Sequence, residues 1–308
     1  MFAKRLVRLV LAPGALPYAL LVVVIGLIWM GVGGRASPGQ SAAVPADEPR
    51  AGSAITYRGP PRPNAPLIGL KQAVSNARRF AGEPGLALEG GLQSDPRSAR
   101  RTELYYLESL GPTRGEDFFK IDARTGEVIE ATLRSRLTPA TPPFGLGQAD
   151  AERIAERYAR ERFYGFADLV LVERSSRPSE NNVLHSFKWN QIAADSGAEL
   201  PISVSIALSA GSGDVVWYLA QRDSLKIDVR PAIDRAQALE AAIFGTGGPD
   251  SRWDTGDSVA VRLQVLYDDD NRQQLVWSVT FRARQETSRP TLRVLVNART
   301  GQLIAGPQ

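Results

Sequence analysis

The chain has 308 residues, 43% hydrophobic and 23% charged, a composition that excludes a wholly disordered, collagen-like or polytopic membrane protein. It has no cysteine and one histidine, His185, which excludes disulfides, thiolate nucleophiles, cysteine zinc sites and two-histidine metal motifs. The net charge is +4, but four basic residues precede the first acidic one, Asp47, and the remainder has 33 basic against 33 acidic residues. This balance argues against a nucleic-acid partner, which requires a surplus of positive charge.

The first predicted element is an apolar helix near the N-terminus. Residues 16–32 form a run of 17 residues without a charge, and Lys4, Arg5 and Arg8 precede it. This pattern predicts a cytoplasmic basic tail over 1–15 and a transmembrane signal-anchor over 16–33. The protein would then be a single-pass cell-membrane protein with an extracytoplasmic body. The alternative is a signal peptide cleaved near residues 41–43, which would export the body as well.

A linker is expected to follow the apolar run. Residues 34–65 are rich in proline and glycine and show no periodicity of apolar residues. Such a composition is typical of an extended spacer without regular structure.

The rest of the chain contains an internal repeat. A glycine-polar-aliphatic-aliphatic motif occurs at Gly126–Ile129, Gly213–Val216 and Gly301–Ile304, so its glycines are 87 and 88 residues apart. The first and third copies also share the words Asp122-Ala-Arg-Thr-Gly and Asn297-Ala-Arg-Thr-Gly. Because a repeat must be recognised before any fold is assigned, we predict three units, over 66–137, 143–222 and 230–308.

Each unit opens with a predicted amphipathic helix. Apolar residues recur at helical spacing over 70–81, ahead of Gly82, and again over 151–159, ahead of Gly165. In the third unit Asp234 and Gln237 form a capping-box pattern before a helix over 235–244.

After each helix the apolar period changes to two. Alternation is clearest over 259–267, 275–281 and 292–296, and it recurs over 183–189 and 202–208. Such strands form an antiparallel sheet with one buried face. At the turns, Asp122 or Asn297 supplies a side-chain acceptor, and Gly126, Gly213 and Gly301 supply a positive φ. The predicted fold class is therefore α+β, with three tandem units, each one helix packed on a small antiparallel sheet, after the N-terminal transmembrane helix.

This order of elements resembles the PepSY domain family and the related YcdB/YcdC-type, YPEB-like tandem repeats. The residues that carry the resemblance are the opening helices at Leu70–Ala73 and Gln148–Ala155 and the strand-turn words at Phe119–Ile129 and Leu295–Ile304. The resemblance spans residues 66–306. The second unit departs from it, since Ser209–Gly213 replaces the turn word.

The resemblance implies a modest function. Similar domains occur in the propeptides of secreted metallopeptidases, where they inhibit the enzyme and assist its folding, and in spore and cell-envelope proteins. It implies no enzyme activity, no cofactor and no catalytic residue.

Few side chains are candidates for chemistry. We interpret His185 as a core residue, because it alternates with Phe187 and Trp189 on the apolar side of a strand. Asp268–Asn271 is interpreted as a solvated hairpin tip and not as a calcium loop, since it lacks the required ligand spacing. Trp189, Trp217 and Trp277 are a candidate interaction surface for an added peptide strand, with core packing as the alternative.

The sequence thus predicts a non-catalytic, membrane-anchored, extracytoplasmic binding or regulatory protein. Its partners would be the membrane, through one span, and an envelope protein or a peptidase that it modulates. We expect no metal and no nucleic acid. A structural envelope scaffold is the alternative, followed by a hydrolase that uses carboxylates such as Glu103 or Glu108.

Overall fold

The computed structural model describes residues 66–94, 103–110, 116–137, 145–179, 182–247, 253–256, 258–283 and 291–305. Its helices are α2 (Leu70–Ala81), α3 (Gln148–Arg162) and α4 (Arg235–Gly245), with short 3₁₀ turns η1 (Arg134–Arg136) and η2 (Phe166–Asp168). The strands are β1 (Leu88–Ser94), β2 (Glu103–Ser109), β3 (Asp117–Asp122), β4 (Val128–Leu133), β5 (Val170–Ser179), β6 (Asn182–Ile192), β7 (Glu199–Ser209), β8 (Val215–Arg222), β9 (Trp253–Asp254), β10 (Ala260–Tyr267), β11 (Gln273–Ala283), β12 (Thr291–Asn297) and β13 (Leu303–Ala305).

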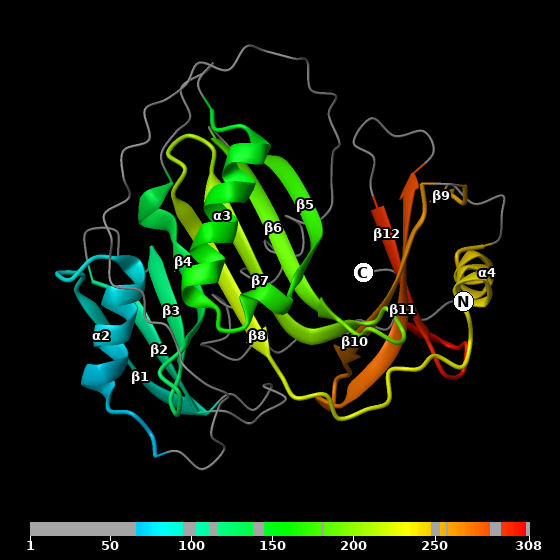
Figure 1. Ribbon diagram of the computed structural model, residues 1–308, viewed down its shortest axis with the longest axis horizontal. Helices are drawn as coiled ribbons and strands as arrows, with labels where there is room; N and C mark the ends of the chain where they lie inside the picture. Colours follow the sequence, from blue (N-terminus) through cyan, green and yellow to red (C-terminus); the bar gives the residue numbers. More distant parts are fainter. Residues whose placement is uncertain are drawn as a thin grey trace, which may run out of the picture.

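The thirteen strands of the described residues belong to one mixed sheet. Figure 1 shows how the larger of them are arranged. Its main path runs β1-β2-β3-β4-β8-β7-β10-β11-β12-β13, while β6 also pairs with β7, β5 with β6, and β9 with β11. The neighbours are antiparallel except β7 and β10, which form one parallel pair between Glu199 and Gln264. The described chain is therefore mostly β.

The predicted fold class is wrong, because the small sheets are not separate units. The last strands of the first two segments, β4 and β8, pair antiparallel, with Glu130 opposite Leu219 and Thr132 opposite Trp217. An isolated last strand would leave a row of unpaired backbone groups at its edge, and this pairing removes both edges at once. The predicted domain boundaries within 66–308 stay predictions.

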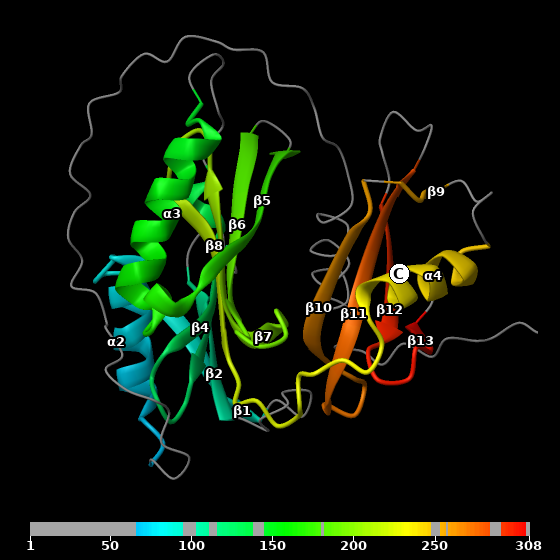
Figure 2. The same cartoon turned by 45° about the vertical axis from the view of Figure 1, so that its right-hand side comes forward.

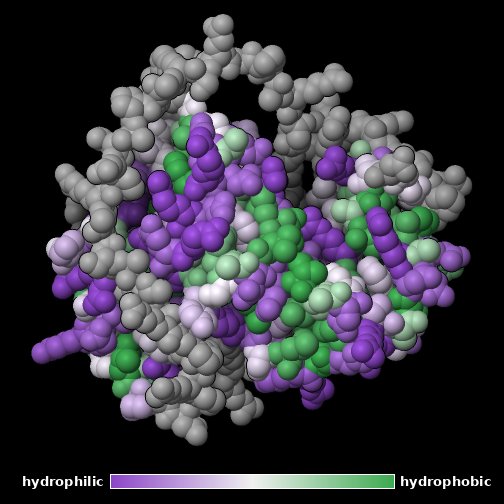
Figure 3. Space-filling view, in the orientation of Figure 1, coloured by the Kyte–Doolittle hydropathy of each residue, from purple (hydrophilic) through white to green (hydrophobic). Residues whose placement is uncertain are grey.

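The helices lie on the outer sides of the molecule. Helices α2 and α3 cover one face of strands β1–β8, and α4 covers the far face of β10–β12 (Figure 2). Helix α2 ends at Gly82, whose φ of 70° permits a left-handed cap, and α4 begins with the expected capping box of Asp234 and Gln237. Over α3 the outer surface is hydrophilic (Figure 3), consistent with its ion pairs Arg153–Asp150 and Arg160–Glu156.

Two hydrophobic cores result. One core lies under both α2 and α3 and includes Phe80, Phe119 and Tyr218, so the first two segments share it. The other lies under α4 and includes Trp277 and Phe281.

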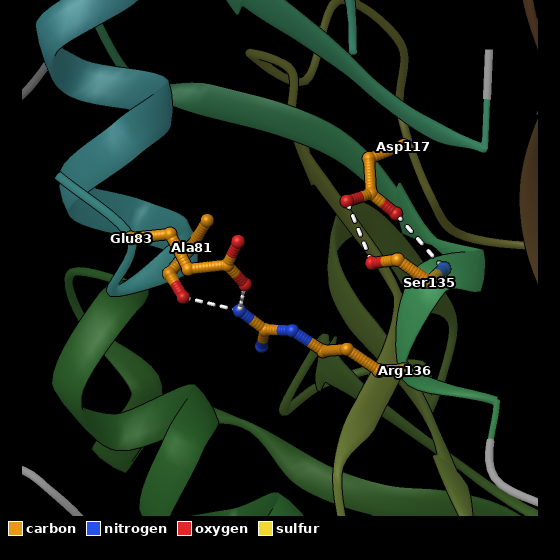
Figure 4. Close-up of polar contacts among 5 residues, drawn as sticks. All are labelled: Ala81, Glu83, Asp117, Ser135 and Arg136. Atoms are coloured by element: carbon orange, nitrogen blue, oxygen red, sulfur yellow. Dashed lines mark hydrogen bonds and ion pairs between the residues drawn. The ribbon is translucent and has the colours of Figure 1, made fainter. Parts of the chain in front are cut away.

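The 3₁₀ turn η1, which follows β4, contacts the end of α2. Arg136 donates to the carbonyl of Ala81 in the last turn of α2 and forms an ion pair of 2.8 Å with Glu83 (Figure 4). Beside it, Asp117 accepts hydrogen bonds from the amide and the hydroxyl of Ser135, at 3.1 and 2.7 Å. A guanidinium at a helix C-terminus pairs with the carbonyls that the helix leaves unsatisfied.

The three glycine turns share one geometry. Gly126, Gly213 and Gly301 have φ of 75°, 76° and 75°, and each amide donates to the carbonyl four residues earlier, at 2.8, 2.8 and 2.9 Å. Asp122 and Asn297 accept amide hydrogen bonds within their turns, through Oδ1 at 2.7–3.1 Å.

A backbone junction ties each turn to the start of a helix. The second turn residue is Ala123, Ala210 or Ala298, and its carbonyl accepts from the amide of Ile68, Leu146 or Ile233, at 2.7, 2.8 and 3.1 Å. The amides of the same alanines donate to Glu103, Val183 and Leu275 in β2, β6 and β11. Every helix therefore starts at the same place relative to its strands.

The predicted localisation needs correction. No helix in the described part of the chain is long and apolar enough to cross a membrane, which contradicts the prediction of a single-pass membrane protein. The segments predicted as basic tail, anchor and linker, residues 1–15, 16–33 and 34–65, lie outside the described residues.

Candidate functional site on the uncovered faces of the sheet

Each strand has one side toward a helix and one side that no helix of the described residues covers. On β6, for example, Phe187 and Trp189 belong to the core under α3, so Lys188 and Asn190 point to the opposite side. We call the sides without a helix the uncovered faces. Because α3 and α4 lie on outer sides, the uncovered faces of β5–β8 and β10–β12 are turned toward each other (Figure 2).

Five charged or polar residues and one leucine follow one another across the uncovered face of the larger part of the sheet. Cross-strand neighbours form one row over β3, β4, β8, β7, β6 and β5, which consists of Lys120, Glu130, Leu219, Ser205, Lys188 and Glu173. Directly opposite side chains lie about 5 Å apart, so such a row is a continuous strip.

A buried carboxylate holds the centre of the site. Glu199, at the start of β7, accepts hydrogen bonds from the side-chain amides of Asn190 at 2.8 Å and Gln264 at 2.9 Å. Arg262 Nη1 lies 3.6 Å from its other oxygen. These bonds connect β6 and β7 to β10, so the carboxylate joins the second and third segments.

Arg293 extends this network onto β12. Its guanidinium donates to Gln264 Oε1 and to Ser278 Oγ, both at 2.7 Å. Among the described residues no carboxylate is within ion-pair distance of Arg293 or of Lys188, although both lie near Glu199 and Glu173.

Burial dominates the electrostatics of this cluster. Burial raises the pKa of Glu173, against the lowering effect of Arg262 and Lys188. Burial likewise lowers the pKa of Lys188, which Glu199 and Glu173 oppose only in part, and it lowers the pKa of Arg293. Charges held in this way are typical of binding and catalytic sites, and also of structural ion networks.

The far end of the uncovered face is aromatic. Lys120 Nζ lies 5.7 Å from the ring centroids of both Tyr106 and Phe118 and forms an ion pair of 2.6 Å with Glu130. This cation is therefore ion-paired, whereas no described carboxylate forms an ion pair with Lys188.

The structure separates the three predicted tryptophans. Trp189 and Trp277 are only 4% and 9% exposed and belong to different cores, so they form no common surface. Trp217 lies on the uncovered face, beside Thr132 and Ala207, and its buried indole N–H has no acceptor among the described residues.

The carboxylates considered for a hydrolase do not meet. Glu103 and Glu108 are five positions apart on β2 and so point to opposite sides of the sheet. Glu103 pairs with Arg124 at 3.3 Å, and Glu108 is exposed. Within the described residues, no group of three His, Asp or Glu side chains is arranged to hold a metal ion. At the hairpin 268–271, Asp268 Oδ1 accepts amide hydrogen bonds from Asp270 and Arg272, at 3.0 and 2.8 Å.

His185 on β6 bonds to the backbone just before α3 and so attaches that helix to the sheet in the second segment. Its Nε2 donates to the carbonyl of Leu146 at 2.8 Å, since a carbonyl can only accept, and Nδ1 contacts the Ser176 hydroxyl at 2.8 Å. The first and third segments have the same bond, from Tyr105 to Ile68 at 2.6 Å and from Trp277 to Ile233 at 3.1 Å.

Sequence reasoning missed this equivalence. The repeat spacing of 88 residues would match Trp277 with Trp189. The register instead places Tyr105, His185 and Trp277 opposite the residue before each glycine turn. The signal was available, because all three residue types combine a flat apolar ring with a polar hydrogen.

No family model and no curated protein matches the chain. Among solved structures, the Bacillus megaterium YpeB C-terminal domain is 19% identical, with a TM-score of 0.47 over 79% of this chain and 99% of that one. A Clostridium difficile protein named as a lipoprotein is 16% identical, with a TM-score of 0.21 over 53% of this chain and 92% of that one. The first of these belongs to the group that the sequence resembles.

Proposed function

We propose that the chain is a non-catalytic, extracytoplasmic binding or regulatory protein that recognises a partner protein over the uncovered faces of its sheet. The observation that carries the proposal is the strip from Lys120 to Glu173, whose charged side chains share with Trp217 a face that no helix of the described residues covers. Trp217 and Lys188 each present a polar hydrogen that no described residue accepts. Such groups favour recognition by hydrogen bonds and charge.

The proposed mechanism involves no covalent chemistry. The Glu199 carboxylate accepts two amide hydrogen bonds through Oε2 and faces Arg262 through Oε1, an arrangement that positions side chains of β6 and β10. The sequence resemblance makes an envelope protein or a peptidase the proposed partner, and the charge-flanked apolar run of residues 16–32 favours export of the body.

Site-specific photocrosslinking in cells tests the proposal. A photoreactive amino acid replaces Leu219, which is 37% exposed on the uncovered face, or Arg157, which is exposed on the outer side of α3. We expect one dominant partner to crosslink at position 219 and not at position 157, and the purified chain to change that partner's activity. Equal crosslinking at both positions would contradict the proposed surface. Binding without any effect on activity would indicate a scaffold.

A further inference from the structure

Two cations on the facing uncovered faces have no carboxylate of the described residues within ion-pair distance. Lys188 projects from β6 and Arg293 from β12, and the charge of Arg293 acts on Lys188. Arg262 is the third cation of the cluster and already faces Glu199 at 3.6 Å. Two carboxylates, Glu199 and Glu173, lie near these three cations, so the cluster has one more positive than negative side chain, and an anion brought by a ligand would balance it.

An acceptor without a donor lies next to these cations. Asn190 is 4% exposed, and its side-chain oxygen has no hydrogen-bond partner among the described residues. The orientation of its amide is not ambiguous, because the Glu199 carboxylate can only accept and must therefore face the Asn190 NH₂ group at 2.8 Å. A buried acceptor left unpaired costs about 1–3 kcal/mol, so a donor from outside is expected.

We propose that Lys188, Arg293 and Asn190 bind an acidic peptide segment of the partner protein, with a side-chain carboxylate on the two cations and a backbone N–H on Asn190 Oδ1. The inference rests on the proposed function and names the chemistry of its partner. A peptide is favoured because it carries both an anion and a neutral N–H donor within a few ångströms.

A monoanionic carboxylate fits the site better than a phosphate group. Glu199 and Glu173 lie near the same cations and would repel a second negative charge on the ligand. Four hydroxyls lie near the cluster in the strand register. Each can accept or donate a hydrogen bond, so they do not favour a phosphate over a carboxylate; they belong to Ser203, Ser205, Ser278 and Thr280.

Peptide binding by the full chain tests the inference. The probe is a fluorescent peptide of alternating glutamate and glycine, and its control has glutamine in place of each glutamate; both are titrated by fluorescence anisotropy. We expect binding of the acidic peptide alone, weakening as salt rises, because the interaction is between charges. Lys188→Met and Arg293→Met should each weaken it at least about tenfold, which is about 1.4 kcal/mol.

The matched control is Lys71→Met. Lys71 is an exposed lysine on α2 and lies outside the strip from Lys120 to Glu173, so its loss should leave the affinity unchanged. Lys188→Arg should retain binding, which separates loss of charge from misfolding, and circular dichroism confirms that each variant is folded.

Equal binding of the glutamine peptide, or an unchanged affinity of folded Lys188→Met, would overturn the inference. So would a crystal structure grown with the acidic peptide in which only water contacts Asn190 Oδ1. If the peptide fails while crosslinking at position 219 persists, the proposed surface stands and only the chemistry assigned to its ligand is wrong.

Discussion

The first and second segments are joined very differently from the second and third. The β4–β8 pair is a ladder of three residue pairs above a shared core, in which the Phe80 ring lies 5.8 Å from Tyr158 and 5.0 Å from Tyr218. The β7–β10 contact has one residue pair, and its side chains form the Glu199 network. The second and third segments, which meet at the β7–β10 contact, belong to different hydrophobic cores. The exception is Ala198 of the β6–β7 turn, which packs into the core of the third segment.

The difference indicates which part of the molecule is rigid. A shared apolar core opens only with global unfolding, whereas a small polar contact opens at lower cost. We therefore expect the first two segments to behave as one body and the third to be the more easily separated, which places the uncovered faces at a joint that a partner could close.

The largest effect is expected from breaking the shared core. Phe80→Ala should lower the free energy of unfolding by about 3–5 kcal/mol, because it removes a ring buried between both segments. Urea denaturation measures this loss, and both segments should unfold in one transition. Phe244→Ala is the control, since Phe244 is 85% exposed, and should change stability by less than about 0.5 kcal/mol. Similar losses in the two variants would contradict the shared core.

A smaller and more local effect is expected from opening the polar joint. Glu199→Ala leaves the side-chain amides of Asn190 and Gln264 without their acceptor, at a cost of about 1–3 kcal/mol. Hydrogen exchange should quicken in β10 and the start of β7, while the β4–β8 ladder keeps its protection. Asp195→Ala, which removes an exposed pair with Arg230, should change neither region. Uniform loss of protection would show that the joint is not a separate unit.

The side-chain bonds that attach the helices to the sheet should each contribute a similar amount to the stability of the fold. His185→Ala should cost about 1–3 kcal/mol through lost packing, and binding of the partner should survive it. Tyr105→Phe removes only the 2.6 Å hydrogen bond to Ile68 and should cost about 1 kcal/mol. Thermal unfolding of both variants measures the difference. A gain of stability in Tyr105→Phe would argue against a fastening role.

The smallest effect should depend on pH. Because burial raises the pKa of Glu173 in the folded state, its ionisation favours the unfolded chain, and stability is lost as pH rises from the ordinary glutamate value through the folded one. Glu173→Gln should therefore melt higher than the parent at pH 7, with the gain shrinking toward pH 4. Glu156→Gln, on the outer side of α3, should show no such gain. If Glu173→Gln raised the melting temperature equally at pH 7 and pH 4, the raised pKa assigned to Glu173 would be contradicted.

Local structure could be predicted where it depends on neighbouring residues. The apolar period gave the bounds of α2, and the Asp234–Gln237 pattern gave the start of α4. The pairing of β4 with β8 could not be predicted, because Thr132 and Trp217 are 85 positions apart and either strand could have been an edge. Non-local strand pairing depends on which edges remain open after each segment folds.

The candidate site was missed for a related reason. Lys188 and Ser205 alternate with apolar residues and so looked like ordinary solvent-facing positions. Only the third segment, through Gln264 and Arg293, turns that side into a cluster of buried charge. Glu199 next to an apolar strand was a usable clue, because a carboxylate at such a position needs donors.

The junction between turn and helix bears on how the three segments have diverged. It is made by the amides of Ile68, Leu146 and Ile233 and by the carbonyls of the turn alanines, groups that every amino acid except proline supplies in full. Mutation can therefore rewrite the side chains of a segment while its geometry is inherited unchanged. The three turn alanines are buried, so their positions accept only small side chains. An ancestral unit could thus be copied and then lose its sequence likeness, leaving a phenol, an imidazole and an indole in one and the same role.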